Sequence, residues 1–484
     1  MAIHQMHLCL RKALLSSRHI VIVLASLSLL LVAGSKCAQA ATPGWNLVAI
    51  DTASNTYLDY TYVPSSGQFT FAWPLLAQWE NQTTYSAIRL LPFTPGPTPT
   101  LTPAQIMTFL PKTQMASKTI NITSYGARTS KDATTAIQNA LNAAGAEATA
   151  SSPVDVLVPA GTYKHSNLLT VPAYVRLRGY PEGAGGTLAA TNVNESAVWL
   201  NGNGSGVLFL NLTSNQTVRG STPDQALIEV GDAWNGVYTT SNILIVGNSL
   251  VGGNSAVNAG VEYHGVWAFN NAKNALADTY YHTFGSSYGQ VIANIATNGG
   301  DDFYSFDGYV GSTNGIVHHF SAIANYGDTT LSDGICACGV GYLTAQSNVI
   351  SYAQGAAVSI YQNEGMNMYG DFNIWVTTNT FLYNSYQNAN GWAYDGVWVK
   401  SDNPSGSNNS TVFGTVQNTH QNLYIDYNYV GYTQVNADGG GHGVGLYNCN
   451  NVTVDGNTLA YNQGLPELNV SGCTNVTKSN NTIE

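Results

Sequence analysis

Charge is the scarcest property of this sequence. Charged residues make up 9% of the 484 positions, against roughly 25% in an ordinary soluble domain. The shortage excludes a coiled coil, a charged helical bundle and a disordered chain kept in solution by charge. The 16 basic residues face 27 acidic ones and form no basic tract, so we expect no nucleic-acid partner.

Long hydrophobic runs are also missing after the first forty residues. Residues 1–40 have the basic start, the short apolar segment and the A-x-A end of a signal peptide, at Arg11, Lys12, Arg18, residues 20–33 and residues 38–40. They predict cleavage near Ala41 and a secreted or periplasmic protein, with a retained membrane anchor as the alternative. No later segment reaches the roughly 18 apolar residues of a membrane helix. We therefore expect a monomer with no membrane contact after cleavage.

Cysteine is too rare for a disulfide scaffold, because only four cysteines follow residue 40: Cys336, Cys338, Cys449 and Cys473. Cys336 and Cys338 are two positions apart, so in a strand they face the same side. A metal site needs further Cys or His at ligand spacing. We find none, and expect two buried small side chains and no metal.

The N-terminal part of the predicted mature chain is rich in aromatic residues. Phe69, Phe71 and Trp73 alternate as on one face of a strand, and residues 41–93 are predicted to form a small β-module. Its aromatics either build an ordinary core or bind carbohydrate. The Pro/Thr-rich residues 94–115 are predicted to be an extended linker.

The next segment predicts how the main domain begins. Asp132 is placed to cap a helix that reaches Ala144, with Ile137 and Leu141 at helical spacing. A strand over 154–158 follows and ends in the P-A-G-T-Y sequence of residues 159–163. With its A-I-Q at residues 136–138, this stretch resembles the start of the pectate-lyase/polygalacturonase superfamily of right-handed parallel β-helices. The resemblance implies that the helix caps the first coil of a solenoid over 116–484.

Repeats support the same all-β fold. Residues 451–459 recur as 475–483, each an alternating strand followed by a turn Asn. Related copies contain the turn residues Asn248, Asn379 and Asn428. Stacked coils would bring such Asn residues into hydrogen-bonded ladders, about 4.8 Å apart. Cys449 and Cys473 occupy equivalent positions in two copies, so we predict a disulfide between them.

A second repeated strand starts with a polar residue, often followed by Gly and an aliphatic residue. Aligning its copies predicts one surface column that runs along the axis: His264, Asp302, Asp333, Asp395 and His442. Irregular spacing between the copies predicts long loops that wall a groove along this column.

Part of this column resembles the polygalacturonase-type glycoside hydrolases. Residues 300–302 match the G-D-D segment of this family, and residues 441–443 match its G-H-G segment. Residues 333–335 match the D-G-I portion of a further family segment. The D-G-I match follows the paired Asp residues where the family has it before them, and the G-H-G match lies far downstream. No Arg or Lys corresponds to those that hold a uronate in the family. The resemblance implies carbohydrate chemistry at this column.

Glycoside hydrolysis needs one carboxyl group that keeps its proton and one that is ionised. Crowded carboxyl groups meet this need because they push each other's pKa values apart. The predicted catalytic residues are Asp301, Asp302, Asp333 and, as a further candidate, Glu364. Asp302 and Asp333 are expected to diverge into the roughly 6.5–9.5 Å separation of inverting enzymes. Capping of turns or structural binding of Ca²⁺ is the alternative use of these Asp residues. Predicted substrate-binding residues are His264, Asp328, Asp395, His442, Tyr304 and Trp398, although aromatic residues commonly pack in cores instead.

Three functions remain open at this point. The first is a glycoside hydrolase that needs no cofactor and cleaves a neutral or weakly charged polysaccharide. The second is a polysaccharide lyase or uronate epimerase, for which Ca²⁺ is a possible cofactor. The third is a non-catalytic solenoid that binds carbohydrate. The scarcity of Arg and Lys favours the first, because a polyanionic substrate needs neutralising cations.

Overall fold

The computed structural model describes residues 118–484 except 180–184, 221–224, 233–238, 309–314, 363–369, 387–393, 402–410, 413–414, 417–419 and 436–438. It also describes residues 60–63, 68–71, 96–98, 106 and 116. The predicted signal peptide, most of the β-module and linker, and Glu364 lie outside the described residues. Within the described part, no helix is long and apolar enough to cross a membrane.

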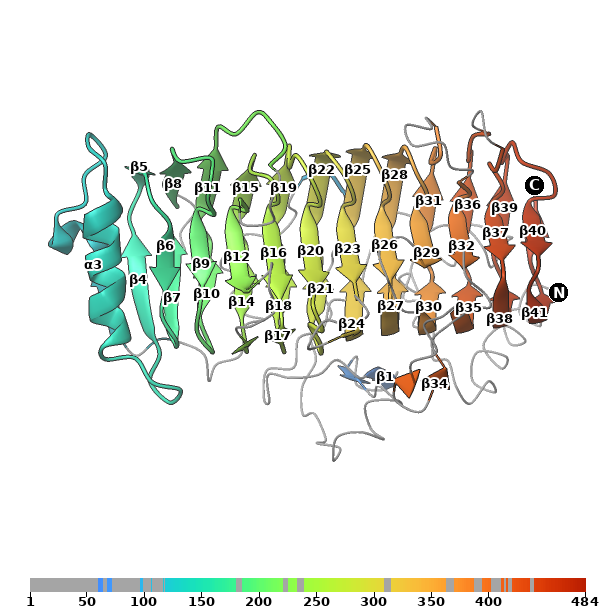
Figure 1. The fold of residues 1–484 in the computed structure, drawn as a ribbon, viewed down its shortest axis with the longest axis horizontal. Coiled ribbons are helices and arrows are strands. Elements are labelled where there is room, and N and C mark those ends of the chain that lie inside the picture. Colours follow the sequence, from blue (N-terminus) through green and yellow to red (C-terminus); the bar gives the residue numbers. More distant parts are fainter. Residues whose placement is uncertain are drawn as a thin grey trace.

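Three parallel sheets form the main domain and stack their strands along its long axis (Figure 1). The 13-stranded sheet runs from β3 (Lys118–Asn121) to β41 (Thr474–Ser479), and the 12-stranded sheet from β5 (Gly161–His165) to β42 (Thr482–Ile483). The third sheet carries the candidate site and has 11 strands: β6 (Leu169–Val171), β9 (Val198–Leu200), β12 (Ile228–Gly231), β16 (Val257–Gly260), β20 (Tyr280–Thr283), β23 (Tyr304–Asp307), β26 (Ile335–Cys338), β29 (Val358–Gln362), β32 (Val397–Ser401), β37 (Val444–Tyr447) and β40 (Leu468–Ser471). Each coil contributes one strand to each sheet, so the predicted right-handed parallel β-helix is confirmed.

Alternation along each strand separates the core from the surface. On β23, Tyr304 and Phe306 are fully buried in the core, and on β26 Ile335 and Ala337 continue the same inward rows. The residues between them, such as Cys336, therefore face outward. Because the strands of adjacent coils pair in register, each outward position becomes a row along the axis.

A ladder of buried Asn residues joins the coils, as the turn Asn pattern predicted. The backbone N–H of Asn270 donates to Oδ1 of Asn294 over 3.0 Å, and its Nδ2 donates to the same oxygen over 2.9 Å. Hydrogen bonds of this kind link the members Asn248, Asn270, Asn294, Asn325, Asn348, Asn379, Asn428, Asn457 and Asn481. The ladder satisfies buried turn backbone that would otherwise be costly.

The predicted helix caps the first coil. Helix α3 (Thr134–Gly145) lies at one end of the solenoid (Figure 1), with Ile137 and Leu141 fully buried. Gln138 accepts from the backbone N–H of Thr170 over 2.9 Å and donates to its carbonyl over 3.1 Å. Its amide thus pairs with β6 as a further strand would. Asp132 accepts from Thr134 N–H, although the residue at the N-cap position is Ala133.

The C-terminal coils are joined covalently. Cys449, in β38 (Cys449–Asp455), forms a disulfide with Cys473, and their Cα atoms are 4.4 Å apart. The predicted pair and the coil register behind it are confirmed. Near the N-terminus, β1 (Tyr60–Val63) pairs with β2 (Gln68–Phe71) as an antiparallel hairpin. The wider β-module of residues 41–93 stays a prediction.

Candidate active site

Four of the five residues predicted to form a surface column align on the 11-stranded sheet, but Asp302, Asp333, Asp395 and His442 are buried there, so the expectation of an exposed column is wrong. The register aligns Tyr280, Tyr304, Ile335, Val358, Val397 and Val444. The residues two positions before them therefore also align, in the order Asp278, Asp302, Asp333, Ala356, Asp395 and His442. Four predicted members occupy consecutive or nearby coils, and Asp278 stands where His264 was expected.

The carboxylates of this column bind the backbone of the following coil. Asp302 Oδ1 accepts from Asp333 N–H over 2.8 Å, and Asp333 Oδ1 accepts from Ala356 N–H over 2.6 Å. Asp395 repeats the arrangement by accepting from His442 N–H over 2.9 Å. These bonds hold the carboxylates in place and give them a structural task as well.

Three acids and one arginine gather around Asp302. Carboxylate oxygens of Asp278, Asp301 and Asp302 lie within 4.8 Å of one another. Oxygens of Asp302 and Asp333 lie within 4.8 Å of each other and of Cys336 Sγ. The expected divergence of Asp302 and Asp333 is therefore wrong, because both side chains lean along the stacking direction. Arg219 forms an ion pair with Asp301, so the cluster does contain an arginine.

Burial and mutual repulsion hold several of these carboxyls in the protonated form. Burial, and then the charges of Asp301, Asp333 and Asp278, raise the pKa of Asp302 well above its ordinary value. Burial and the charges of Asp301 and Asp307 raise the pKa of Asp278 in the same direction. Burial is the main cause that raises the pKa of Asp333 to about 7. Asp301 is more accessible, with 28% of its side chain exposed, and it forms an ion pair with Arg219.

Three predicted substrate contacts are wrong. His264 precedes β18 (Val266–Ala268) of the 13-stranded sheet, so it belongs to another face. Asp328 lies in β25 (Tyr326–Thr330) of the 12-stranded sheet and accepts from Ser351 Oγ over 2.8 Å. Tyr304 points into the core, where it has no exposed surface and its hydroxyl donates to the carbonyl oxygen of Tyr326.

Trp398 lies on the expected sheet but offers no open ring face. It is only 2% exposed, because Tyr361 stacks on it at 5.1 Å between ring centroids and Tyr394 packs edge-on at 4.9 Å. A sugar cannot stack on this ring, so its predicted role is also wrong.

Asp395 and His442 form a second polar group further along the column. The Tyr447 hydroxyl donates to Asp395 Oδ2 over 2.9 Å, and His442 Nδ1 lies 2.7 Å from the Pro466 carbonyl oxygen. Asn469 Nδ2 lies 3.2 Å from His442 Nε2. The pair occupies the predicted column, while its role in substrate binding remains a prediction.

Sequence reasoning missed three residues of the cluster: Arg219, Asp278 and Asp307. Asp278 lacks the following Gly of the repeated pattern, and only the strand register reveals its position. Arg219 comes from a segment 82 positions before its partner Asp301, a distance that no local motif encodes. Asp307 ends β23 and faces Cys338 on the next coil.

Two ligand sets in the cluster suit different cations. The oxygens of Asp278, Asp301 and Asp302 suit a hard cation such as Ca²⁺. Asp307, Cys336 and Cys338 combine two sulfurs with one oxygen, a set that soft or borderline metals prefer. Asp302, Asp333 and Cys336 form a third close set that shares residues with both.

Comparison with known proteins relates the fold to three solved structures. The A-module of the mannuronan C-5 epimerase AlgE6 of Azotobacter vinelandii is 16% identical with a TM-score of 0.51, over 75% of this chain and 99% of that one. An exopolygalacturonase of Thermotoga maritima is 10% identical with a TM-score of 0.50, over 78% of this chain and 95% of that one. The family 28 exopolygalacturonase of Yersinia enterocolitica is 13% identical with a TM-score of 0.50, over 86% and 80%.

No protein-family model matches the chain, and no curated protein matches it either. At these identities the likeness concerns the fold, so the comparisons do not assign an activity. The chain has the right-handed parallel β-helix fold of pectate-lyase/polygalacturonase-like proteins, as the resemblance in its sequence implied.

Proposed function

We propose that this protein is a glycoside hydrolase that cleaves a neutral or weakly charged polysaccharide, with Asp302 as the general acid. The observation that supports it most is the line of carboxyls on three consecutive coils, Asp278, Asp302 and Asp333, with Asp301 beside them. In the polygalacturonase-type enzymes, the segments that carry the acids lie on neighbouring coils. Asp278 likewise supplies an acid on the coil before the G-D-D match of residues 300–302.

The electrostatics of the cluster divide the roles. Asp302 keeps its proton because of burial and neighbouring charges, and donates it to the glycosidic oxygen as the bond breaks. Asp301, which forms an ion pair with Arg219, assists the attack of water at the anomeric carbon. Burial and the charge of Asp301 keep the pKa of Asp302 high, and Asp278 and Asp333 are the neighbouring acids on the coils before and after it. Water supplies the hydroxyl group of one product and the proton that restores Asp302.

The charge balance supports a substrate with little charge of its own. After Arg219 the sequence has only three basic residues, Lys273, Lys400 and Lys478, and Arg219 is engaged with Asp301. A dense polyanion would meet several carboxylates with few cations to offset them. Secretion as a monomer, with contact to polysaccharide alone, belongs to the same proposal.

The test is the variant Asp302→Asn in the full chain. Asn keeps the oxygen that accepts from Asp333 N–H, so the fold should persist, while turnover should fall by roughly 10²–10⁴ because the proton donor is gone. The matched control is Asp455→Asn, because Asp455 accepts from Ser479 and Asn480 on another sheet. Equal turnover in the two variants would place the active site elsewhere.

A uronate epimerase or polysaccharide lyase is the second candidate. The oxygens of Asp278, Asp301 and Asp302 lie close enough to share a Ca²⁺ ion, and Arg219 adds a positive charge beside them. Both features suit a reaction that removes a proton next to a carboxylate. The products separate this candidate from the hydrolase, since a lyase leaves a C=C bond.

A further inference from the structure

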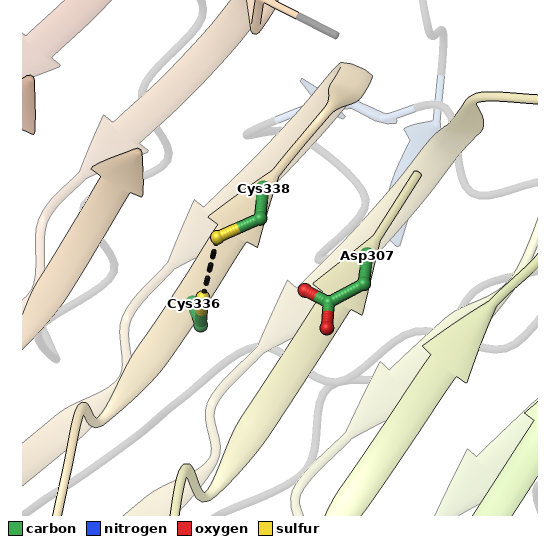
Figure 2. Close-up of side chains that lie close together, drawn as sticks. All are labelled: Asp307, Cys336 and Cys338. Carbon is green, nitrogen blue, oxygen red and sulfur yellow. Dashed lines mark hydrogen bonds between the residues drawn. The ribbon is translucent and has the colours of Figure 1, made fainter. Parts of the chain in front are cut away.

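Two thiols and a carboxylate meet on the outer face of the 11-stranded sheet, and the proposed hydrolysis does not use them. Cys336 and Cys338 lie on β26 on either side of the inward Ala337, with their Sγ atoms 2.9 Å apart. Asp307 on β23 is the register partner of Cys338. Figure 2 shows its carboxylate turned toward the strand that carries the thiols. One oxygen of Asp307 and both sulfurs lie within 4.8 Å of one another.

We propose that Asp307, Cys336 and Cys338 form a binding site for a thiophilic divalent cation of the zinc type. Tetrahedral zinc with Zn–S bonds of about 2.3 Å holds two sulfurs about 3.8 Å apart. Small side-chain rotations open the thiol pair from 2.9 Å to that distance. Binding forms two metal–sulfur bonds and one metal–oxygen bond, and releases both thiol protons to solvent. The fourth position stays open for water, as in zinc sites with three protein ligands.

Strand geometry opposes a disulfide between these two cysteines. Two residues along a strand span about 6.4–6.8 Å, whereas a disulfide needs Cβ atoms about 3.5–4.5 Å apart. β26 pairs with β23 on one side and β29 on the other, so its backbone cannot pucker without breaking both ladders. Cys449 and Cys473 differ because they face each other across neighbouring coils. A shared metal ion tolerates the wider spacing of Cys336 and Cys338.

Neighbouring side chains position the carboxylate of Asp307. Ser305 Oγ donates to Asp307 Oδ1 over 3.4 Å, and Asp307 also has a hydrogen bond with the Tyr281 side chain. Such outer bonds orient a ligand for its metal. Oxygens of Asp302 and Asp333 lie within 4.8 Å of Cys336 Sγ. These oxygens therefore lie beside the proposed site.

The two thiols are buried in the protein as it stands. The hydrogen bond with Cys338, and then burial, raise the pKa of Cys336 well above its usual value. The hydrogen bond with Cys336 lowers the pKa of Cys338, but burial and the charges of Asp307, Asp371 and Asp302 together raise it to about 12. A bound divalent cation deprotonates a coordinating thiol outright. Both cysteines are also buried against Tyr361, which shields a metal–thiolate bond from water.

The experiment uses the full chain after chelator treatment and measures binding of Zn²⁺ and Co²⁺ alone. We expect one equivalent of metal bound by calorimetry and elemental analysis. Bound Co²⁺ should show a thiolate-to-metal charge-transfer band. Cys336→Ser/Cys338→Ser should lose the band and the bound equivalent. Asp307→Asn should weaken metal binding by at least roughly 10–100-fold, which is the cost of losing a residue that merely orients a metal ligand. This single variant tests the site even if the Ser double variant does not fold. Asp426→Asn, a buried acid on the 13-stranded sheet, is the matched control and should bind as the parent does.

Three outcomes would overturn the site. The first is absence of binding while thiol titration of the denatured protein finds Cys336 and Cys338 reduced. The second is a Cys336–Cys338 disulfide found by mass spectrometry of the untreated protein. The third is unchanged binding in the Ser double variant, which would assign the metal to the carboxylates alone. All readouts are independent of hydrolysis, so failure here leaves the proposed activity untouched.

Discussion

Single carboxyl groups in this solenoid serve the fold and the candidate site together. Asp302 and Asp333 each accept a backbone N–H from the next coil, while their neighbours' charges and burial shift their titration. Removing such a side chain to Ala would leave a buried N–H without a partner, at a cost of about 1–3 kcal/mol. Replacement by Asn is therefore the informative change. It removes the acid proton but keeps an oxygen that can accept the backbone N–H of the next coil.

Asp426 predicts how the protein's stability depends on pH. Its side chain is buried, its Oδ1 has no hydrogen bond, and burial followed by the charge of Asp455 raises its pKa to about 7. Because the folded pKa exceeds the unfolded value of about 3.9, the folded state holds this proton more tightly. The stability it contributes is complete below about pH 4 and is lost as pH rises through about 7.

Asp426→Asn should therefore raise the free energy of unfolding at pH 8 and leave it nearly unchanged at pH 4. Denaturant unfolding at the two pH values measures the difference, and the low-pH comparison is the internal control. Equal stability of variant and parent at pH 8 would contradict the shifted pKa.

At the scale of elements, α3 should stabilise the solenoid by closing its first coil. Ile137→Asp would place an unpaired charge between the helix and the core, where Ile137 has no exposed surface. We expect a loss of several kcal/mol and a clearly lower melting temperature. Asn139→Asp, on the exposed side of the same helix, is the control and should change stability by less than about 0.5 kcal/mol. Equal melting of the two variants would show that α3 is not a cap.

The Asn ladder should be equally sensitive at its centre. Asn348 Oδ1 accepts from Asn325 N–H, and its Nδ2 donates to the Ala322 carbonyl over 2.9 Å. Asn348→Ala leaves both buried groups without a partner, each worth about 1–3 kcal/mol. Urea unfolding should show a loss of that size, compared with a small change for Asn139→Ala. A loss below about 0.5 kcal/mol would mean that water or neighbouring groups replace the ladder.

The sequence predicted those features that repeat with the coils. The Asn turns and the Cys449–Cys473 pair follow from periodicity, the cap follows from the family resemblance, and the structure confirms all three. His264 was misplaced because its Gly-aliphatic pattern also occurs before strands of the 13-stranded sheet. The expected place was taken by Asp278, which carries no such pattern.

Contacts between coils account for the rest of the site that the sequence did not predict. Arg219 reaches Asp301 from a distant segment, and Asp307 joins the two cysteines across a coil boundary. Ligand spacing along the chain cannot reveal either contact. The burial of Tyr304 and Trp398 depends on the sheet face and on neighbouring rings, which alternation alone does not fix.

At the scale of the whole molecule, stacking brings residues of separate coils into one extended row. Asp278, Asp302, Asp333, Asp395 and His442 follow the long axis of the solenoid because every strand of the 11-stranded sheet pairs in register. Along this axis, Asp395 and His442 lie three and four coils beyond Asp302. This arrangement suits a chain-like substrate better than a small sugar.

Product analysis on a panel of polysaccharides tests the central claim most directly. The full chain should release reducing ends from a neutral or weakly charged polymer, without the near-ultraviolet absorbance of a new C=C bond, and Asp302→Asn should abolish that release. Absorbing products from a polyuronate would instead show lyase chemistry at the same acids. Release of reducing ends that is equal in the parent and Asp302→Asn would contradict the proposed role of this carboxyl line.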